Sequence, residues 1–288
     1  MSEMQNIQWF PGHMAKTRRK IKEILPLIDA VAEVVDARVP VSSRNPELRS
    51  IIGAKPLMIL LNKCDMADPA ATADWIEYYK SKGITAIGIE CKTGKGISTF
   101  KNAVKTLLAD KLKAYADKGM VGKPLRVMVV GIPNVGKSTF INRIAGNNRA
   151  KAENRPGVTR GNQWFTVDKQ LELLDTPGVL WPKFEDKTVG ERLALTGAVK
   201  DNVIDRELLA VRLCEILADD YADRLDARYK ISGDYTGGYD LLCEIGKKRG
   251  MIMRGGEINT ERTANMLLEE FRNCKIGNIT LERAKKNA

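Results

Sequence analysis

The stretch Gly131-Ile-Pro-Asn-Val-Gly-Lys-Ser138 fits the pattern GxxxxGK[ST], in which a glycine-rich loop wraps around a chain of phosphates. It follows the apolar run 125–130, which we expect to be a strand, and it leads into a segment expected to be helical from Lys137. Backbone N–H groups and a helix N-terminus together bind phosphate, so this context supports the motif. We expect Lys137 to reach the outer phosphates and the Ser138 hydroxyl to bind Mg²⁺.

A second nucleotide motif, Asp175-Thr-Pro-Gly178, follows the expected strand 171–174. The tetrapeptide DxxG is common by chance, so its weight comes from its position after a strand and downstream of the phosphate loop. We expect Asp175 to hold Mg²⁺ through water and the Gly178 N–H to meet the γ-phosphate. Thr159 lies between the phosphate-loop helix and the next strand. There it would complete the Mg²⁺ coordination and order a switch loop.

Base selection is assigned to Asn62-Lys-Cys-Asp65, which follows the expected buried strand 56–61. The Asp65 carboxylate can accept hydrogen bonds from both N1–H and the 2-amino group of guanine, a donor pair that adenine lacks. The motif therefore predicts GTP and disfavours an ATP-using kinase. The Lys63 stem would lie along the base and ribose. Asn62 would either address the other edge of the base or pin neighbouring loops.

Two weaker signals accompany these motifs. Glu90-Cys-Lys92 follows the expected strand 84–89, where GTPases carry a loop, often written SAK, whose backbone N–H meets the guanine oxygen. Only Lys92 matches that pattern, and Cys91 would supply the N–H. Asn134 lies inside the phosphate loop, as in GTPases stimulated by potassium, so its side-chain oxygen would help to hold K⁺ beside the phosphates. A plain turn is the alternative for both.

The order of the motifs predicts the fold. In common GTPases the phosphate loop precedes the guanine-reading motif, whereas here the guanine-reading motif comes first. Strands and helices alternate up to about residue 184, and only helical segments follow, near 189–199, 204–218, 220–229, 237–249 and 257–273. We therefore predict an α/β fold with a circularly permuted P-loop GTPase domain over 1–184, a mostly parallel sheet flanked by helices. A helical, basic, RNA-binding domain over 185–288 is expected after it.

The composition limits the classes of binding partner that we expect. The chain has 288 residues, with 47 Lys and Arg against 36 Asp and Glu, a net charge of +11. Such a charge favours nucleic acid first and an anionic membrane surface second. Residues 14–29 read as a basic amphipathic helix that Pro26 could stop early. No run approaches the roughly 18 apolar residues that a membrane span needs, so we expect no membrane insertion.

The cysteines and the N-terminus bear on the compartment. The five cysteines are widely spaced and form no CxxC pair, and the chain has one histidine. A disulfide framework and a structural zinc site are therefore not expected. The first residues contain no apolar stretch of the signal-peptide kind. Together these features favour a reduced cytoplasm.

The chain resembles the circularly permuted ribosome-assembly GTPases of the YlqF/RbgA type. Besides the nucleotide motifs, the resemblance rests on Trp9-Phe-Pro-Gly-His-Met14, Asp36-Ala-Arg-Val-Pro40, Glu244-Ile-Gly-Lys-Lys-Arg-Gly250 and Arg254-Gly-Gly-Glu257. It implies a Mg²⁺-dependent GTPase that binds GTP and GDP. It also implies binding to the large ribosomal subunit, through rRNA and ribosomal proteins, late in assembly, with hydrolysis linked to release.

One departure bears on catalysis. Val179 follows the DTPG motif, where many GTPases carry a glutamine that orients water. The resemblance suggests His13 as the replacement catalytic group beside Lys137, although a surface or packing histidine is the alternative. We expect slow hydrolysis by the free protein and stimulation by the ribosomal subunit. A non-catalytic, GTP-gated RNA-binding assembly factor and a membrane-surface GTPase remain alternative functions.

The expected site residues fall into two groups. Those expected to contact the nucleotide are Asn62, Lys63, Asp65, Cys91, Lys92, Asn134, Val135, Gly136, Lys137, Ser138, Thr139, Thr159 and Gly178. Those expected to bind metal are Ser138, Thr159 and Asp175 for Mg²⁺ and Asn134 for K⁺.

Overall fold

A computed structural model describes residues 11–146, 163–176, 186–199, 205–231 and 235–284, with side chains from Arg18 onward. The chain forms two compact units. The sheet unit comprises the described residues between 11 and 176 together with 282–284, and the helical unit comprises those between 186 and 281. Residues 282–284 thus lie with the sheet unit, although the sequence analysis grouped them with the helical domain.

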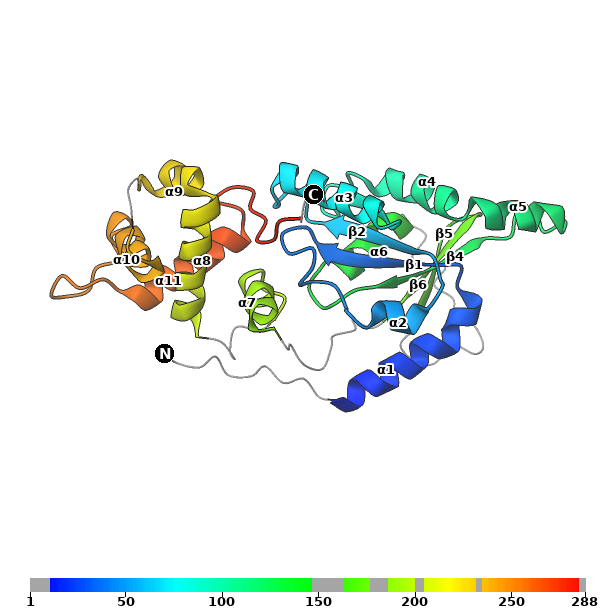
Figure 1. Ribbon diagram of the computed structural model, residues 1–288, viewed down its shortest axis with the longest axis horizontal. Helices are drawn as coiled ribbons and strands as arrows, with labels where there is room; N and C mark the ends of the chain where they lie inside the picture. The colour runs from blue at the N-terminus through cyan, green and yellow to red at the C-terminus, as the bar shows by residue number, and fades with distance from the viewer. Residues whose placement is uncertain (1–10, 147–162, 177–185, 200–204, 232–234, 285–288) are drawn as a thin grey trace. The chain divides into compact units, whose positions relative to one another are not determined.

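Within the described residues, six strands form one sheet in the order β3-β2-β1-β4-β6-β5 (Figure 1). Their bounds are Ala30–Asp36 (β1), Leu57–Asn62 (β2), Thr85–Ile89 (β3), Leu125–Val130 (β4), Gln163–Asp168 (β5) and Leu171–Asp175 (β6). Every neighbouring pair is parallel except β5 and β6, which are antiparallel. β1 pairs with β4 although 88 residues separate their ends, and strand order reverses there, which is where open α/β sheets bind ligands.

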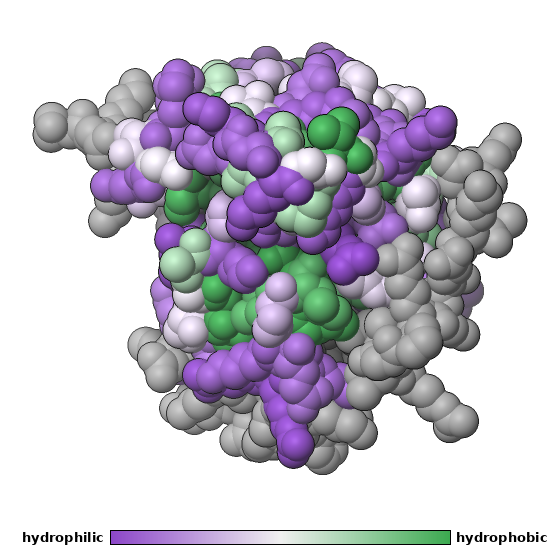
Figure 2. Space-filling view, turned by 90° about the vertical axis from the view of Figure 1, so that its right-hand side faces the viewer, coloured by the Kyte–Doolittle hydropathy of each residue, from purple (hydrophilic) through white to green (hydrophobic). Residues whose placement is uncertain are grey.

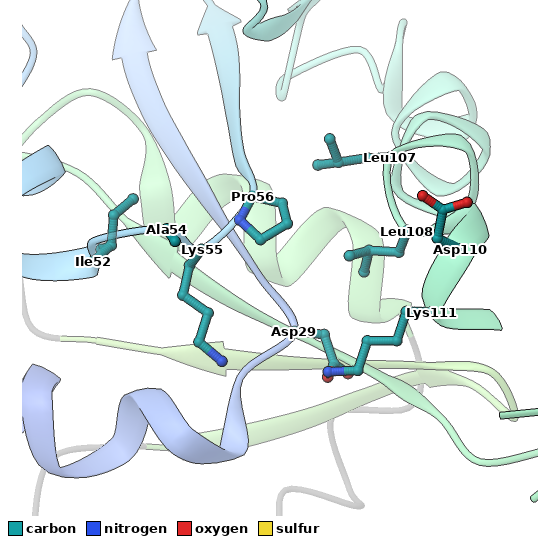
Figure 3. A pocket seen from close by; sticks show the side chains of 9 residues that line it. All are labelled: Asp29, Ile52, Ala54, Lys55, Pro56, Leu107, Leu108, Asp110 and Lys111. Carbon is teal, nitrogen blue, oxygen red and sulfur yellow. The ribbon is translucent and has the colours of Figure 1, made fainter. Parts of the chain in front are cut away.

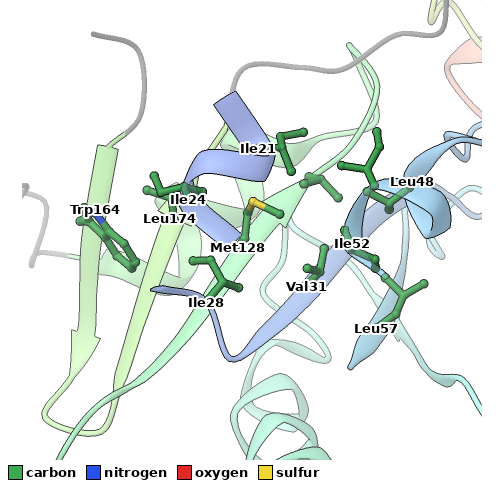
Figure 4. Close-up of a cluster of buried hydrophobic side chains, with 12 residues drawn as sticks. Ile21, Ile24, Ile28, Val31, Leu48, Ile52, Leu57, Met128, Trp164 and Leu174 are labelled. Atoms are coloured by element: carbon green, nitrogen blue, oxygen red, sulfur yellow. The ribbon is translucent and has the colours of Figure 1, made fainter. Parts of the chain in front are cut away.

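Most strand positions are apolar because helices cover both faces of the sheet. On one face lie α1 (Pro11–Ile24), α2 (Leu48–Ile52) and α3 (Pro69–Ser81). Figure 4 shows isoleucines at the end of α1 packed over β1 and β4. On the other face lie α4 (Ile97–Leu107) and α6 (Lys137–Ala145), whose Phe100 and Phe140 rings meet edge to face. Burial on both faces is typical of a parallel sheet and explains the absence of alternating polarity.

Most expected elements are confirmed, and two helices differ. α1 ends at Ile24 and a short 3-10 turn carries Pro26, so the early stop is confirmed. The apolar spacing over 96–117 predicts one long helix, and the structure contradicts this prediction, because the chain leaves helical geometry at Leu108 (φ −112°, ψ 23°) before α5 (Ala109–Asp117). α5 has no buried residue, since the apolar stripe that holds α4 on the sheet stops at Leu108. The sequence also predicts a short helix over 45–52, and α2 begins later, at Leu48, because Asn45 is held in a turn and by Glu33.

The helical unit contains α7 (Lys187–Leu195), α8 (Arg206–Asp220), α9 (Ala222–Tyr229), α10 (Gly238–Lys248) and α11 (Thr260–Arg272), close to the expected segments. α8 packs against α10 and α11 through buried leucines. Gly238 is needed at the start of α10, because a Cβ there would lie 2.4 Å from the Val211 carbonyl oxygen of α8. The predicted all-helical C-terminal region is confirmed for the described residues.

Charge is divided unevenly between the units. Residues 184–281 carry 15 Lys and Arg against 18 Asp and Glu, while the rest of the chain carries 32 against 18. Residues 185–288 hold 18 basic and 19 acidic residues, so the basic character expected for the whole of that domain is wrong. The positive charge of the protein lies in the sheet unit and, within the helical unit, in the run Lys247–Arg249.

All five cysteines are free thiols. Among the helices of the described residues, none is both long and apolar enough to cross a membrane.

Candidate functional site

The nucleotide motifs meet at the carboxyl ends of the parallel strands. The parallel strands β1, β2, β3, β4 and β6 all end there, because parallel strands share a direction. Asp36 ends β1, Asn62 ends β2 and Asp175 ends β6, while the Glu90–Lys92 loop and the phosphate loop follow β3 and β4. Asn62 and Asp175, which are 113 residues apart in the chain, thereby lie at the same end of the sheet, although the motifs do not follow the usual order.

The phosphate loop runs from β4 into α6 and is pressed against its neighbours. Gly136 has φ of 98°, and a Cβ there would lie 2.2 Å from Asn62 Nδ2. A Cβ at Gly131 would lie 2.8 Å from the Val34 carbonyl oxygen. Both glycines are therefore required by close approach to the carboxyl-terminal parts of β2 and β1. A glycine-rich run of backbone N–H groups that opens helix α6 is the donor set that a phosphate chain needs.

Charged side chains adjoin the start of α6. Lys137 is almost fully buried and its ammonium forms an ion pair with Asp175 of β6. The Thr176 hydroxyl donates to the Val129 carbonyl (2.8 Å) and fixes the end of β6 to β4. Ser138 and Thr139 are exposed. No cluster of three or more acidic, histidine or cysteine side chains occurs in the described residues, so Mg²⁺ here would need nucleotide phosphates as ligands beside Ser138 and Asp175.

Asn62 joins two loops. Its Nδ2 donates to the Val135 carbonyl in the phosphate loop (2.7 Å), and its Oδ1 accepts from the Cys91 N–H (3.2 Å). Of the two roles left open by the sequence, the geometry therefore gives Asn62 the pinning of neighbouring loops. The Cys91 N–H, expected to meet the guanine oxygen, is engaged by Asn62 in this structure.

Lys63 makes the second link to the phosphate loop. Its Nζ donates to the Asn134 carbonyl (2.8 Å) and forms an ion pair with Asp36 (2.9 Å). Both Lys63 and Asn134 have left-handed backbone, each with φ of 65°. Asparagine tolerates this conformation better than most residues. The backbone geometry therefore explains an asparagine at position 134 without any role in potassium binding. Lysine has no such tolerance, so its contacts must offset the strain.

Asp36 is a site residue that sequence reasoning quoted without giving it a role. Arg38 holds its carboxylate with two side-chain bonds, from Nε to Oδ1 (2.9 Å) and from Nη2 to Oδ2 (2.7 Å). Burial by itself would raise the pKa of Asp36, but the charges of Arg38 and Lys63 outweigh it and hold the pKa at about 2. A polar residue directly after a buried strand was the signal available, as it was for Asn62.

The remaining expected residues of these loops are at the surface. Asp65 and Lys92 are both exposed. The Arg143 side chain of α6 donates to the Lys92 carbonyl and ties the Glu90–Lys92 loop to the phosphate-loop helix. Burial raises the pKa of Cys64 to about 11 and that of Cys91 to about 12, so both thiols are protonated at neutral pH.

Three expected residues are not placed by the structure. Thr159 and Gly178 lie outside the described residues, as does Val179. His13 falls within α1, but its side chain is not described. Their roles stay predictions.

A hollow of about 440 Å³ lies at the opposite edge of the sheet, where β1 and β2 begin (Figure 3). It is lined by Asp29, Ile52, Ala54, Lys55, Pro56, Leu107, Leu108, Asp110 and Lys111. Figure 2 looks onto the end of the sheet unit at which α5 lies and shows hydrophobic side chains framed by hydrophilic ones. The Asp29 carboxylate accepts from the Arg126 N–H (2.8 Å) and pairs with Lys111, so it fastens α5 and β4 to β1.

Comparisons with known proteins agree with this geometry. Residues 126–226 match the family model described as "50S ribosome-binding GTPase". The chain is 49% identical to ribosome biogenesis GTPase A of Priestia megaterium over 96% of each chain. It is 30% identical to the protein of that name from Thermotoga maritima, over 96% of this chain and 94% of the other.

Two solved structures are similar over most of their length. The GDP-bound structure of TM YlqF superposes with a TM-score of 0.64 and 27% identity, covering 92% of this chain and 99% of the other. GNP-bound YlqF from T. maritima gives 0.61 and 26%, covering 93% and 98%. These matches extend over both units, and the permuted motif order agrees with them. The predicted fold, a circularly permuted P-loop GTPase domain followed by helices, is confirmed, and the chain belongs to the ribosome biogenesis GTPase A family.

Proposed function

We propose that this GTPase binds the large ribosomal subunit or its precursor late in assembly and that GTP hydrolysis is linked to its release. GTP and GDP are the nucleotides and Mg²⁺ the metal. The free protein hydrolyses GTP slowly, and the ribosomal subunit accelerates the reaction. The protein acts in the cytoplasm, where bacterial ribosomes assemble.

One observation carries the nucleotide part of the proposal. Asn62 and Lys63 reach the phosphate loop directly, at 2.7 Å to the Val135 carbonyl and 2.8 Å to the Asn134 carbonyl. These direct hydrogen bonds hold the guanine-reading motif beside the phosphate loop. Both motifs therefore lie close enough to contact one bound nucleotide. Asp65 would read N1–H and the 2-amino group of guanine, and Lys92 would line the base. The Cys91 N–H would contact the base only after leaving Asn62, which accepts it in this structure.

The chemistry at the phosphate end follows from the charges present. With nucleotide bound, Lys137 would leave Asp175 for the outer phosphates, and Asp175 would become free to hold Mg²⁺ through water. Ser138 and Thr159 would bind the metal directly, and the Gly178 N–H would meet the γ-phosphate. The N–H groups of Val135, Gly136 and Thr139 would contact the phosphates.

Catalysis requires a group other than the residue after the DTPG motif. Val179 cannot orient water, so we assign that role to His13, brought to the γ-phosphate when the ribosomal subunit orders the switch loops. A neutral imidazole can accept a hydrogen bond from water. If His13→Ala were stimulated by the subunit as strongly as wild type, His13 would be structural.

The charge division indicates how the subunit is contacted. The excess of Lys and Arg lies in the sheet unit, so we assign most rRNA phosphate contacts to that unit, including Arg18 and Arg19 of α1. Residues 247–254 supply the contacts of the helical unit. Phosphate contacts make binding salt-sensitive. Reversal of Arg18, Arg19 and Lys20 to Glu should weaken subunit binding and leave GTP affinity intact. Binding of the wild-type protein to anionic vesicles instead of ribosomal subunits would support the membrane-surface alternative.

Two experiments test the proposal. The first compares Asp65→Asn with wild type for guanine and xanthine nucleotides. The amide presents a donor where guanine also donates, so GTP affinity should fall by at least tenfold while xanthine nucleotides gain relative affinity. Unchanged GTP affinity would remove Asp65 from the base site.

The second experiment is gradient sedimentation of cell extract with GTP, GDP or a non-hydrolysable GTP analogue. Association with the large subunit or its precursor in the GTP-like state alone supports the proposal, and nucleotide-independent association contradicts the link to release. A single-turnover assay with added subunits separates an enzyme from the non-catalytic alternative. Faster hydrolysis in K⁺ than in Na⁺, lost in Asn134→Ala, would support a potassium role.

A further inference from the structure

The last described residues of the chain bind the sheet unit through a buried glutamate. Both Glu282 oxygens accept main-chain hydrogen bonds, from the Val41 N–H to Oε2 (2.5 Å) and from the Ser42 N–H to Oε1 (3.1 Å), and the Ser42 hydroxyl donates to Oε1 as well. Glu282 is 5% exposed. This carboxylate therefore holds the loop that follows β1, from a position 240 residues later in the chain.

Two neighbouring contacts fasten the same segment to α3. The Trp75 indole N–H donates to the Glu282 carbonyl (2.9 Å), and Arg283 forms an ion pair with Asp68 (2.9 Å), the N-cap of α3. We call residues 282–284 the return strap, because they belong to the sheet unit although the described residues before them, up to Leu281, belong to the helical unit.

The loop held by the strap leads by direct contacts to the nucleotide loops. Next to Ser42, the Ser43 hydroxyl accepts from the Asp36 N–H (2.9 Å). The Asp36 carboxylate pairs with Lys63 (2.9 Å), and Lys63 donates to the Asn134 carbonyl of the phosphate loop (2.8 Å). Every member of this chain of contacts belongs to the sheet unit.

From these contacts we infer that Glu282 is a positioning residue for nucleotide retention: through Ser42, Ser43 and Asp36 it holds Lys63 and the phosphate loop in their binding geometry. The helical unit is then joined to the nucleotide site at both of its ends. Its N-terminal end follows the Asp175–Gly178 motif, and its C-terminal end continues into the strap. A force or rearrangement in the helical unit that loosens the strap would speed GDP release.

This inference rests on the proposed nucleotide site, and the test separates the two. Dissociation of a fluorescent GDP analogue from the full chain is measured by chasing with excess GDP. Binding by wild type, and its loss in Asp65→Asn, tests the site itself. For the strap, Glu282→Ala should raise the dissociation rate about five- to tenfold, within the range measured for couplings of this kind. Trp75→Phe, which removes only the indole donor, should give a smaller increase.

A matched control is Glu172→Gln. Glu172 is also a buried carboxylate of the sheet unit, with Arg126 as its ion-pair partner at 3.1 Å, but it lies near the amino end of β4 and β6. The Glu172→Gln substitution should lower the thermal stability of the protein without changing the rate of GDP dissociation. Equal increases in Glu172→Gln and Glu282→Ala would overturn the inference, because general destabilisation would then explain both.

The route is tested by combining variants. If the effect passes through Ser43, then Ser43→Ala should raise the dissociation rate, and adding Glu282→Ala to it should change the rate by less than twofold. Glu282→Gln keeps one carbonyl acceptor, so its GDP dissociation rate should lie between those of wild type and Glu282→Ala. A wild-type rate in Glu282→Ala and in Trp75→Phe, or fully multiplicative effects with Ser43→Ala, would overturn the inference.

Discussion

Among the described residues, each unit has a carboxylate held by two cations, and the two clusters differ in what they hold. In the sheet unit, Asp36 binds Arg38 through two bonds and Lys63 at 2.9 Å. In the helical unit, Glu270 of α11 binds Arg228 of α9 (Nε to Oε2, 2.9 Å) and Arg249 (3.4 Å). The first is the Asp36 cluster and the second the Glu270 cluster.

Connectivity separates the two clusters. Lys63 of the Asp36 cluster continues to the Asn134 carbonyl in the phosphate loop. Arg249 of the Glu270 cluster instead stacks over the Tyr229 ring at 5.0 Å, and the Tyr229 hydroxyl donates to Glu270 (2.9 Å). The same pairing of charges therefore connects β1 to the phosphate loop in one unit and fastens α9, α11 and the end of α10 in the other.

Burial also differs. The side chains of Asp36 and Arg38 are 4% and 2% exposed, whereas Arg228 and Arg249 are both 31% exposed. Removing the Asp36 carboxylate leaves the charge of Arg38 buried where water cannot reach it. The Asp36 cluster should thus be more sensitive to mutation than the Glu270 cluster, both in stability and in nucleotide binding.

The largest effect is expected for Asp36→Asn. It leaves Arg38 buried beside a neutral amide and should lower the free energy of unfolding by about 3–5 kcal/mol. It also frees Lys63, so GDP affinity should fall at least tenfold. Urea unfolding and GDP titration measure the two effects, and a stable variant with normal GDP affinity would remove the distinction between the clusters.

The pH dependence of stability should follow from the same carboxylate. The pKa of Asp36 is lowered from 3.8 to about 2, so its ionised form stabilises the fold above about pH 4, and that contribution is lost as pH falls toward 2. At 1.36 kcal/mol per pKa unit the loss is about 2 kcal/mol. Urea unfolding at pH 5, 4 and 3 should show a smaller decline in Asp36→Asn than in wild type. Identical declines would mean that Asp36 does not titrate in this range.

Glu270→Gln is expected to have a smaller effect. The hydrogen bond from Arg228, opposed by partial burial, lowers the pKa of Glu270, so the ionised form is the stabilising one. Losing hydrogen bonds to a charged group should cost about 2 kcal/mol or less, since water reaches Arg228 and Arg249. GDP affinity should stay within twofold of wild type. A tenfold loss of GDP affinity would show that the Glu270 cluster also supports the nucleotide site.

The smallest stability effects are expected from the second cations. Lys63→Met and Arg249→Met each remove one partly exposed cation and should change the free energy of unfolding by about 1 kcal/mol or less. They form a matched pair, because only Lys63→Met should speed GDP dissociation. Similar dissociation rates in the two variants would contradict the positioning role of Lys63.

Local patterns in the sequence determined a large part of this protein. β2 is a continuous apolar run up to Asn62. β1, up to Asp36, and β4 are apolar apart from Glu33 and Arg126, so these strands and the residues at their carboxyl ends can be read locally. The order of the motifs then predicted the permuted fold. The helix break at Leu108 escaped prediction, because loss of the apolar stripe beyond Leu108 has no sharp sequence signal comparable to a proline.

Only the tertiary structure decided which residues act together. Asn62 had two open roles, and the 2.7 Å bond to the Val135 carbonyl selects the one that fixes the phosphate loop. Asp36 carries no motif label of its own, and its importance comes from two cations that the fold brings to it. Glu282 was grouped with the wrong unit, because its partners Val41 and Ser42 lie 240 residues away and bind through main-chain N–H groups. Every residue except proline offers the same main-chain donor, so no sequence pattern records such a contact, and the return of the chain to the sheet unit exists only in three dimensions.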